Sequence, residues 1–242
     1  MSSQAPIYKK LSVIIPAYNE EKTISQIIKK VRDISIAPLE KEIIVVDDTS
    51  SDTTPYILKN MPGIVALFHK KNSGKGAAIK TGLLHAVGDI ILIQDADLEY
   101  EPRDYPSLLA PIVEGKADFV MGSRFLLERP RFFTKNGDPF FAHYVGNKII
   151  IWVTNCLYRK KFTDYEGGYK CFTKKLSDDI PIRTNSFDFD NELICKALKS
   201  GYTLQEVSIQ YNPRPYTEGK KINWKHGLKI LWTIVQCKFK KI

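Results

Sequence analysis

Four short apolar runs, rich in β-branched residues, constrain the fold of this chain more than any other feature. They cover Leu11–Pro16, Lys41–Val46, Ile64–His69 and Asp89–Gln94, and each leads into a cluster of polar residues. Because the apolar residues follow one another without polar alternation, each strand is expected to be buried on both faces, as in a parallel sheet. Open α/β sheets bind ligands beyond the carboxyl ends of their strands, so the polar clusters mark the expected site.

Apolar residues spaced three and four apart predict helices between and after these strands. The predicted helices are Thr23–Ile34, Thr53–Lys59, Gly76–Ala86, Tyr105–Glu114, His143–Tyr158, Phe187–Ser200 and Trp224–Phe239, with further strands at Phe119–Gly122 and Gln205–Ile209. We therefore predict an α/β fold with a mostly parallel central sheet, helices on both of its faces and a C-terminal amphipathic helix. The expected division is a main domain over residues 1–222 and an appended helix over 223–242.

The charge balance points to an anionic partner. Lysine and arginine number 36 against 27 aspartates and glutamates, a formal net charge of +9 in 242 residues. A nucleotide, a lipid phosphate, a phospholipid surface or a nucleic acid would suit this charge. The four cysteines lack the spacing of a zinc site, which predicts a reducing compartment. No apolar signal core and no run approaching 18 apolar residues is present, so neither a signal peptide nor a membrane span is expected.

The run Ile90–Glu99 places two aspartates, Asp95 and Asp97, one residue apart at the end of a strand. In an extended backbone, residues i and i+2 point to the same side. If the strand persists to this point, both carboxylates face one position, where a hard divalent cation could bind together with substrate phosphates. The alternative is that the two aspartates simply open a loop.

Two upstream clusters suit a nucleotide. In the segment 16–20 a tyrosine ring can lie on a base while a carboxylate accepts its hydrogens, although a capped helix start explains the same residues. In the segment 72–76, a Walker A motif is excluded, because it would need glycine at His69 and serine or threonine at Gly76. A helix start carrying Lys75 nevertheless favours an anion.

The segments Pro16–Glu20, Asp47–Asp52, Asn72–Gly76 and Asp95–Glu99 together resemble the GT-A (nucleotide-diphosphosugar transferase) fold of family 2 glycosyltransferases. Within this family they are most similar to the polyprenyl-phosphate sugar transferases, the dolichyl-phosphate mannose synthase group. The resemblance covers roughly residues 10–235 and implies that 1–222 form a GT-A catalytic domain. It further implies inverting transfer of a sugar from GDP-mannose or a UDP-hexose to polyprenyl or dolichyl phosphate, with Mg²⁺ or Mn²⁺.

The resemblance also assigns donor-side roles to individual residues. The implied metal ligands are Asp95, Asp97 and Glu99, the last standing where the family often has a side-chain amide. Thr49 departs from the family by replacing a usual glycine. The implied nucleotide-sugar-binding residues are Pro16, Tyr18, Glu20, Asp47, Asp48, Lys75, Asp95 and Asp97.

On the acceptor side, Gly122-Ser-Arg124 matches a family motif whose arginine lies near the acceptor phosphate, a role that suits a guanidinium. The segment Thr163–Phe172 matches another motif loosely and retains a cation in Lys170. A basic loop lies near the end of the chain, at Tyr211–Lys221, and a solvated surface loop is the alternative explanation for its charges. The implied acceptor-phosphate ligands are Arg124, Lys170, Arg214, Lys220 and Lys221.

A second carboxylate cluster, Asp188, Asp190 and Glu192, bears on the acceptor. Transfer to a sugar hydroxyl needs a base to take the proton, whereas a lipid phosphate is already ionised near neutral pH. The sequence leaves both acceptors open, the alternative being glycosyl transfer to a saccharide hydroxyl in polysaccharide or glycan synthesis. The expected catalytic residues are Asp97, Arg124, Asp190 and Glu192.

The last helix suggests how a lipid acceptor is reached. Leu228, Leu231, Trp232, Val235 and Phe239 share one face, flanked by lysines, and His143–Tyr158 has a similar apolar side. We expect a cytoplasmic protein peripheral to the cytoplasmic face of a membrane. Packing against the sheet or a homodimer contact is the alternative, and a separate membrane subunit remains open.

Two other functions fit the sequence poorly. A sugar-nucleotide-forming nucleotidyltransferase would need a glycine-rich basic loop after Leu11–Pro16, which is absent. A nucleic-acid partner is not expected, because no nucleic-acid-binding motif accompanies the positive charge.

Overall fold

The computed structural model describes residues 7–126, 141–212 and 224–240. Its strands are β1 (Lys10–Ala17), β2 (Glu40–Asp47), β3 (Val65–Phe68), β4 (Ile90–Ile93), β5 (Phe119–Ser123), β6 (Lys170–Thr173) and β7 (Leu204–Ser208). Its helices are α1 (Ile24–Asp33), α2 (Thr54–Lys59), α3 (Lys75–His85), α4 (Tyr105–Val113), α5 (Phe141–Tyr158), α6 (Lys174–Asp179), α7 (Phe189–Lys199) and α8 (Trp224–Phe239), with a 3₁₀ turn at Pro102–Asp104.

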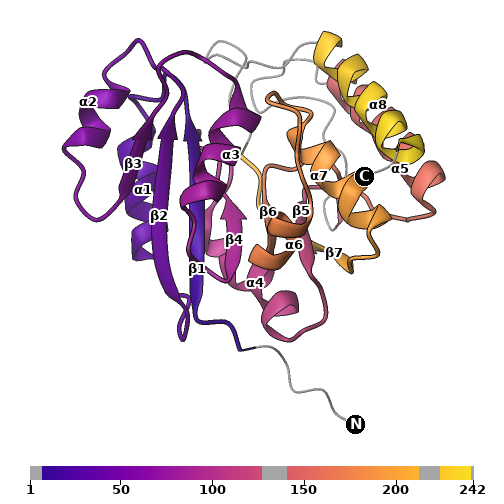
Figure 1. Cartoon of the computed structure of the whole chain (residues 1–242), viewed down its shortest axis with the longest axis horizontal. Coiled ribbons are helices and arrows are strands. Elements are labelled where there is room, and N and C mark those ends of the chain that lie inside the picture. Colours follow the sequence, from indigo (N-terminus) through magenta and orange to yellow (C-terminus); the bar gives the residue numbers. More distant parts are fainter. Residues whose placement is uncertain (1–6, 127–140, 213–223, 241–242) are drawn as a thin grey trace.

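The strands form one sheet in the order β3-β2-β1-β4-β6-β5-β7 (Figure 1). All neighbouring pairs are parallel except those of β6, which runs antiparallel to both β4 and β5. The carboxyl ends of β1, β2 and β4 therefore lie at one edge of the sheet, as the parallel prediction required. The mostly parallel α/β sheet is confirmed.

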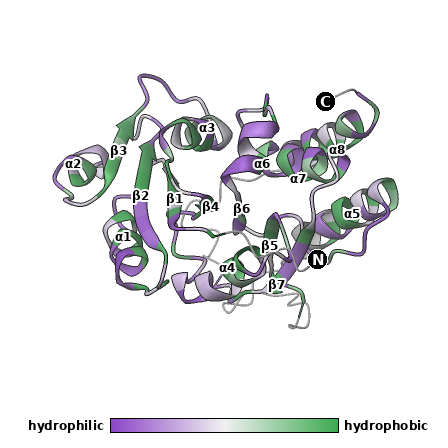
Figure 2. Ribbon diagram, turned by 60° about the horizontal axis from the view of Figure 1, so that its bottom comes forward, coloured by the Kyte–Doolittle hydropathy of each residue, from purple (hydrophilic) through white to green (hydrophobic). Residues whose placement is uncertain are grey.

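Helices cover both faces of the sheet, as Figure 2 shows, with α1 and α4 on one side and α3, α6 and α7 on the other. The uniformly apolar strands explain this arrangement, because alternate residues of one strand enter different cores. In β4, Ile90 and Leu92 pack with α1 and α4, whereas Ile91 and Ile93 pack with α3 and α7. The absence of polar alternation thus correctly indicated burial on both faces.

The predicted elements agree with the structure to within a few residues, but two were missed. Strand β6 and helix α6 follow one another directly, within a segment that the sequence marked only as a loose motif. Strand β4 is also shorter than predicted, ending at Ile93, so that Asp95 and Asp97 lie in a turn. The assumption that extended geometry persists to both aspartates was therefore wrong.

A third core joins α8 to α5 and α7. Its buried members include Ile150, Tyr158, Cys195, Ile230 and Ile234. The face of α8 that packs is therefore only partly the apolar face singled out from the sequence. Of that predicted face, Leu228, Trp232 and Phe239 are exposed, whereas Leu231 and Val235 are half-buried and Leu231 packs against the third core. Val145, Ile149 and Trp152 on the neighbouring α5 are exposed as well. Residues 127–140 and the predicted domain boundary at residue 222 lie outside the described residues, so the two-part division stays a proposal.

Candidate active site

The two aspartates that end β2 lie in different surroundings. The Asp48 carboxylate accepts hydrogen bonds from the backbone N–H groups of Ser73 (2.9 Å) and Gly74 (2.7 Å). The ring nitrogen Nδ1 of His69 lies 2.7 Å from the same carboxylate. Asp47 Oδ2 accepts from the N–H of Ser50, whereas Oδ1 is buried without a hydrogen-bond partner in the described part of the chain. Asp48 therefore shapes the loop before α3, and Asp47 retains a free acceptor.

The loops after β1 and β2 are joined by side-chain hydrogen bonds. Asn19 Oδ1 accepts from Ser51 N–H (2.8 Å), and Glu21 Oε2 accepts from Thr53 N–H (3.0 Å). Thr49 has a φ of 64°, in the left-handed region that normally favours glycine. This conformation explains why glycine is usual at this position in the family. The joined loops hold Pro16 and Tyr18, both half-buried, at the edge of the sheet.

Glu20 supports the start of α1. Its carboxylate accepts from the hydroxyl of Thr23 at 2.8 Å, and its N–H donates to Thr54 Oγ1 at 3.0 Å. The capped-helix interpretation thus describes part of its role, and contact with a base stays a prediction.

Lys75 and Asp95 meet at the centre of the site. Lys75 opens α3, and its Nζ lies 2.5 Å from Asp95 Oδ1. Burial alone would favour the neutral amine, but the carboxylates of Asp95, Asp190 and Asp97 hold the pKa of Lys75 above its usual range. Asp190 Oδ1 is buried and has no hydrogen-bond partner among the described residues. The structure thus brings together residues from three motifs around one ammonium group.

The position of Asp95 is fixed from two sides. The preceding residue, Gln94, is fully buried, and its Oε1 accepts from the hydroxyls of Tyr105 and Tyr169, each at 2.9 Å. On the other side, a Cβ added to Gly168 would lie 2.4 Å from Asp95 Oδ2. A side chain at position 168 would therefore displace the Asp95 carboxylate, or the Tyr100 ring at 2.5 Å, which glycine leaves undisturbed.

Arg124 forms a buried ion pair. Its Nε and Nη2 donate to Asp164 Oδ2 (2.7 Å) and Oδ1 (3.0 Å), and its backbone N–H also donates to Oδ2. The guanidinium lies 5.2 Å from the ring centres of both Phe125 and Tyr211. Burial opposes the charged carboxylate, but Arg124 outweighs it and holds the pKa of Asp164 below its usual range. Contact of Arg124 with an acceptor phosphate stays a prediction.

Lys170 is fully buried in β6, and its ammonium group donates to the carbonyl oxygen of Gly167. Glu166 accepts from Asn191 Nδ2 at 3.0 Å, and burial raises the pKa of this carboxyl group. Sequence reasoning did not select Asp164 or Glu166. The loose motif at Thr163–Phe172 was the available signal, since two acidic residues directly precede the Gly-Gly pair.

The carboxylates of the second cluster point in different directions. Residues two apart on a helix are about 200° apart around its axis, and Glu192 accordingly faces away from Asp190. It accepts from the N–H groups of Arg183 and Thr184, and Lys196 Nζ lies 2.6 Å away. Asp188 is buried and binds α8, through Lys229 Nζ (3.0 Å) and Thr233 Oγ1 (3.1 Å). Of these three carboxylates, Asp190 is the one whose charge acts on the Lys75 ammonium group.

The carboxylates suit a hard divalent cation in part. Asp95 and Asp97 supply oxygen ligands, the type that Mg²⁺ and Mn²⁺ prefer. Among the described residues, no group of three or more acidic, histidine or cysteine side chains is arranged to hold a metal by itself. Magnesium commonly binds through one or two carboxylates and completes its coordination shell with water and substrate phosphates. The site therefore fits a cation that arrives with a diphosphate. Glu99 lies in the same turn, and its role as a ligand stays a prediction.

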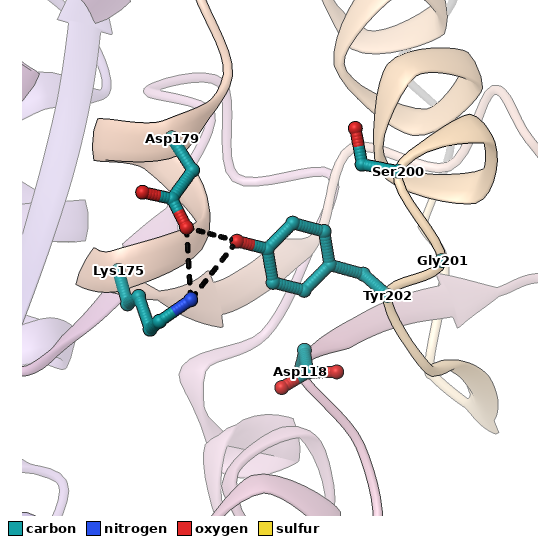
Figure 3. Close-up of a pocket in the computed structure, with 6 residues that line it drawn as sticks. All are labelled: Asp118, Lys175, Asp179, Ser200, Gly201 and Tyr202. Carbon is teal, nitrogen blue, oxygen red and sulfur yellow. Dashed lines mark hydrogen bonds and ion pairs between the residues drawn. The ribbon is translucent and has the colours of Figure 1, made fainter.

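Three predicted acceptor ligands, Arg214, Lys220 and Lys221, lie outside the described residues. A cavity of about 430 Å³ lies at the opposite end of the strands, beside Asp118, which precedes β5 (Figure 3). There Asp179 Oδ2 lies 2.9 Å from Lys175 Nζ and accepts from the hydroxyl of Tyr202 at 2.5 Å. These groups satisfy one another, far from the carboxyl ends of β1, β2 and β4.

The family model for glycosyl transferase family 2 matches residues 12–179. This match spans the whole of the site around Lys75 and Asp95 apart from Asp190. The chain is a family 2 glycosyltransferase.

Its relatives extend this assignment. The glycosyltransferase is 30% identical over 204 residues to glycosyltransferase AglJ of Haloferax volcanii, covering 84% of this chain but 63% of AglJ. It is 29% identical to the UDP-N-acetylglucosamine–dolichyl-phosphate N-acetylglucosaminyltransferase of Methanococcus voltae, covering 97% of this chain and 98% of that protein. Both relatives are glycosyltransferases by name.

Solved structures show that the glycosyltransferase has the GT-A fold. Glucosyl-3-phosphoglycerate synthase from Mycobacterium tuberculosis, crystallised with Mn²⁺, UDP and phosphoglyceric acid, matches with a TM-score of 0.73 at 18% identity. The match covers 97% of this chain and 80% of the synthase. In the described part of the chain, no helix combines the length and apolar character needed to cross a bilayer.

Proposed function

We propose that this glycosyltransferase moves a sugar from a nucleotide sugar, GDP-mannose or a UDP-hexose, to a polyprenyl or dolichyl phosphate. The reaction uses Mg²⁺ or Mn²⁺ and inverts the configuration at the sugar C1. The Methanococcus voltae relative supports the acceptor, because its name specifies dolichyl phosphate and the match covers nearly all of both chains.

The donor is recognised at the carboxyl ends of β1, β2 and β4. Tyr18 lies against the base, and the free, buried Oδ1 of Asp47 accepts a hydrogen from the base or ribose. Asp48 contributes indirectly, because its carboxylate is already bound by the backbone of Ser73 and Gly74. Lys75, at the start of α3, then binds the diphosphate, where the helix N-terminus also favours an anion.

The observation that carries the lipid acceptor is the direct connection between the site and an exposed apolar surface. Asp190 belongs to the Lys75 group, and Asp188, two residues earlier, binds Lys229 and Thr233 of α8. On an adjacent side of α8, about 60° around the helix axis from Lys229, Trp232 is 63% exposed. A lipid acceptor that approaches along α8 would therefore bring its phosphate group close to the first turn of α7.

The chemistry then needs few groups from the protein. A phosphate oxygen of the acceptor forms a bond to C1 while the bond from C1 to the donor diphosphate breaks, and the electron pair leaves with the diphosphate. The bound cation would stabilise the charge on this leaving group. No proton has to be removed from the ionised acceptor, so Asp190 positions the sugar and does not act as a base. Attack from the opposite face converts an α-linked donor into a β-linked product.

Product formation with purified protein tests this function. Radiolabelled UDP-glucose, UDP-N-acetylglucosamine and GDP-mannose are each offered with Mg²⁺ or Mn²⁺, with and without a short polyprenyl phosphate. We expect label from one donor to enter the organic phase only when the lipid phosphate is present. Donor binding without any label in the lipid would contradict the proposed acceptor.

A saccharide hydroxyl is the second candidate acceptor, and one observation favours it. Asp190 Oδ1 is buried without a hydrogen-bond partner in the described chain. A carboxylate that acts as a general base toward the acceptor hydroxyl needs such a free oxygen. If this candidate is correct, label will enter a sugar acceptor in the absence of lipid.

As part of the proposal, the exposed faces of α5 and α8 rest on an anionic bilayer at the cytoplasmic side. Trp152 and Trp232 are 68% and 63% exposed, and Phe239 is 75% exposed. The two helices contain no aspartate or glutamate but several lysines, which suits anionic headgroups. Both lie side by side at the outer side of the molecule, with green hydrophobic segments along them in Figure 2.

Substitution of either Trp152 or Trp232 by glutamate is expected to weaken binding to anionic phospholipid vesicles. Burial of a large apolar side chain is worth about 2 kcal/mol, so each change should reduce affinity by about tenfold or more. Co-sedimentation with vesicles measures the effect. Leu84→Glu is the matched control, because Leu84 is 86% exposed on α3 and belongs to neither helix.

Wild-type binding by both tryptophan variants would contradict the membrane contact. A change from dimer to monomer in light scattering, with unchanged vesicle binding, would instead identify the surface as a contact between two copies of the chain.

A further inference from the structure

Lys75 is held rigidly at the centre of the site. The preceding residue, Gly74, has a φ of 94°, and its N–H is bound by Asp48. A Cβ at Gly74 would lie 2.4 Å from the carbonyl oxygen of Asn185, so the loop is packed against the segment before α7. The turn therefore gives Lys75 one starting position, from which its Nζ reaches Asp95 Oδ1 at 2.5 Å.

This ammonium group is paired with Asp95 and also feels the charges of Asp190 and Asp97. Asp95 and Asp97 come from the turn after β4, and Asp190 comes from the first turn of α7. All three act on the Lys75 ammonium strongly enough to outweigh its burial. Like charges gathered in a partly buried site repel one another, so an acidic cluster of this kind requires a positive charge to be stable.

We propose that Lys75 is an internal counter-ion, which pairs with Asp95, offsets part of the negative charge of Asp95, Asp97 and Asp190 in the absence of donor, and thereby weakens binding of free divalent cations. The inference rests on the proposed function only in placing a cation at Asp95 and Asp97. It adds an order of events, in which the cation binds well only together with the donor.

Electrostatic interactions of Lys75 couple binding of the cation to binding of the donor. A lysine ammonium paired with Asp95 occupies one oxygen that the cation needs, and its positive charge repels a second cation nearby. The donor diphosphate brings several negative charges, and the ammonium can pair with them. When Lys75 turns from Asp95 to the diphosphate, both aspartates become available at the moment when phosphate oxygens arrive to complete the coordination shell.

The test is the affinity for Mn²⁺ measured without acceptor, by electron paramagnetic resonance and by calorimetry. For Lys75→Gln, we expect the affinity for Mn²⁺ alone to rise by about tenfold or more, because one unit charge beside the site is removed. The affinity for UDP in the presence of Mn²⁺ should fall. The two changes have opposite signs, which a general loss of structure cannot produce.

Two further variants make the result specific. Lys75→Arg keeps the charge and should retain weak binding of Mn²⁺ alone. Lys80→Gln removes a lysine from the same helix, whose ammonium group donates to Asn185 and to the carbonyl of Arg183, and should change neither affinity. In the wild type, UDP should strengthen Mn²⁺ binding by a larger factor than in Lys75→Gln.

Affinity for Mn²⁺ alone that is unchanged or lower in Lys75→Gln would overturn the inference. Failure of the wild type to bind Mn²⁺ in the presence of either UDP or GDP would also overturn it, and would remove the cation from the proposed function. An error in the acceptor would leave these measurements unaffected, since no acceptor is present.

Discussion

Replacement of Asp97 by asparagine is expected to lower kcat/KM for sugar transfer by about 10³-fold. The substitution keeps the shape of the side chain but removes the charge that would bind the cation at the departing diphosphate. Stabilisation of this kind is worth several kcal/mol, and each 1.36 kcal/mol corresponds to a factor of about ten in rate. Initial rates of label transfer at saturating Mg²⁺ and Mn²⁺ measure the loss.

Asp179→Asn provides the control for this experiment. Asp179 is a carboxylate already paired with Lys175, but it lies in the cavity at the other end of the strands (Figure 3). This change should leave kcat/KM within about twofold of the wild-type value, which corresponds to a change in activation free energy well below the 1.36 kcal/mol of a tenfold effect. Retention of most of the wild-type rate by Asp97→Asn would show that Asp97 is not a ligand of a catalytic cation.

The second large effect concerns stability. Asp164→Asn should lower the free energy of unfolding by about 3–5 kcal/mol, because it leaves the guanidinium of Arg124 buried without its counter-charge. Asp164 is fully buried, and Arg124 donates two side-chain hydrogen bonds to it. For a chain of this length the loss corresponds to a fall in Tm of roughly 10 °C. Thermal and urea unfolding, followed by circular dichroism, measure the effect.

The double variant Asp164→Asn/Arg124→Met separates this cause from a general packing defect. The double variant should lose less free energy of unfolding than the sum of the losses in the two single variants. An additive result would show that the ion pair itself contributes little.

The ion pair between Arg124 and Asp164 also predicts that the stability of the folded protein depends on pH. The folded-state pKa of Asp164 lies below its value in the unfolded chain, so the folded protein holds its proton less tightly. The stabilisation is therefore present above the unfolded pKa, about 3.9, and is lost as the pH falls through the folded pKa. The difference in stability between wild type and Asp164→Asn should accordingly shrink below about pH 4.

Individual residues show why part of the site escaped sequence reasoning. His69 was given no role, because a lone histidine has no motif, yet it contacts Asp48 and Thr81 at 2.7 and 2.8 Å. Lys170 was assigned to the acceptor phosphate from the resemblance to a family motif, which does not show that β6 buries this lysine completely. Strand β6, with the sequence Lys-Cys-Phe-Thr, lacks the apolar run that marked β3 and β4, which are equally short, and it pairs with strands far away in the sequence.

Glu192 and Asp190 illustrate the same limit within one helix turn. The sequence could not distinguish them, since both are acidic and both lie near the start of α7. Only the packing of α7 against α3 directs Asp190 toward Lys75 and turns Glu192 to the backbone of Arg183 and Thr184.

The amino-acid sequence by itself determined the α/β class, the doubly buried strands, the family and the edge at which the polar clusters meet. These follow from local patterns, since apolar runs and helical spacing act within a few residues of each other. The tertiary structure decided which charges neutralise one another, Lys75 with Asp95 and Arg124 with Asp164, and which face of α8 stays exposed. The physical reason is that Coulomb interactions and burial depend on distances between residues remote in the chain, which no local pattern contains.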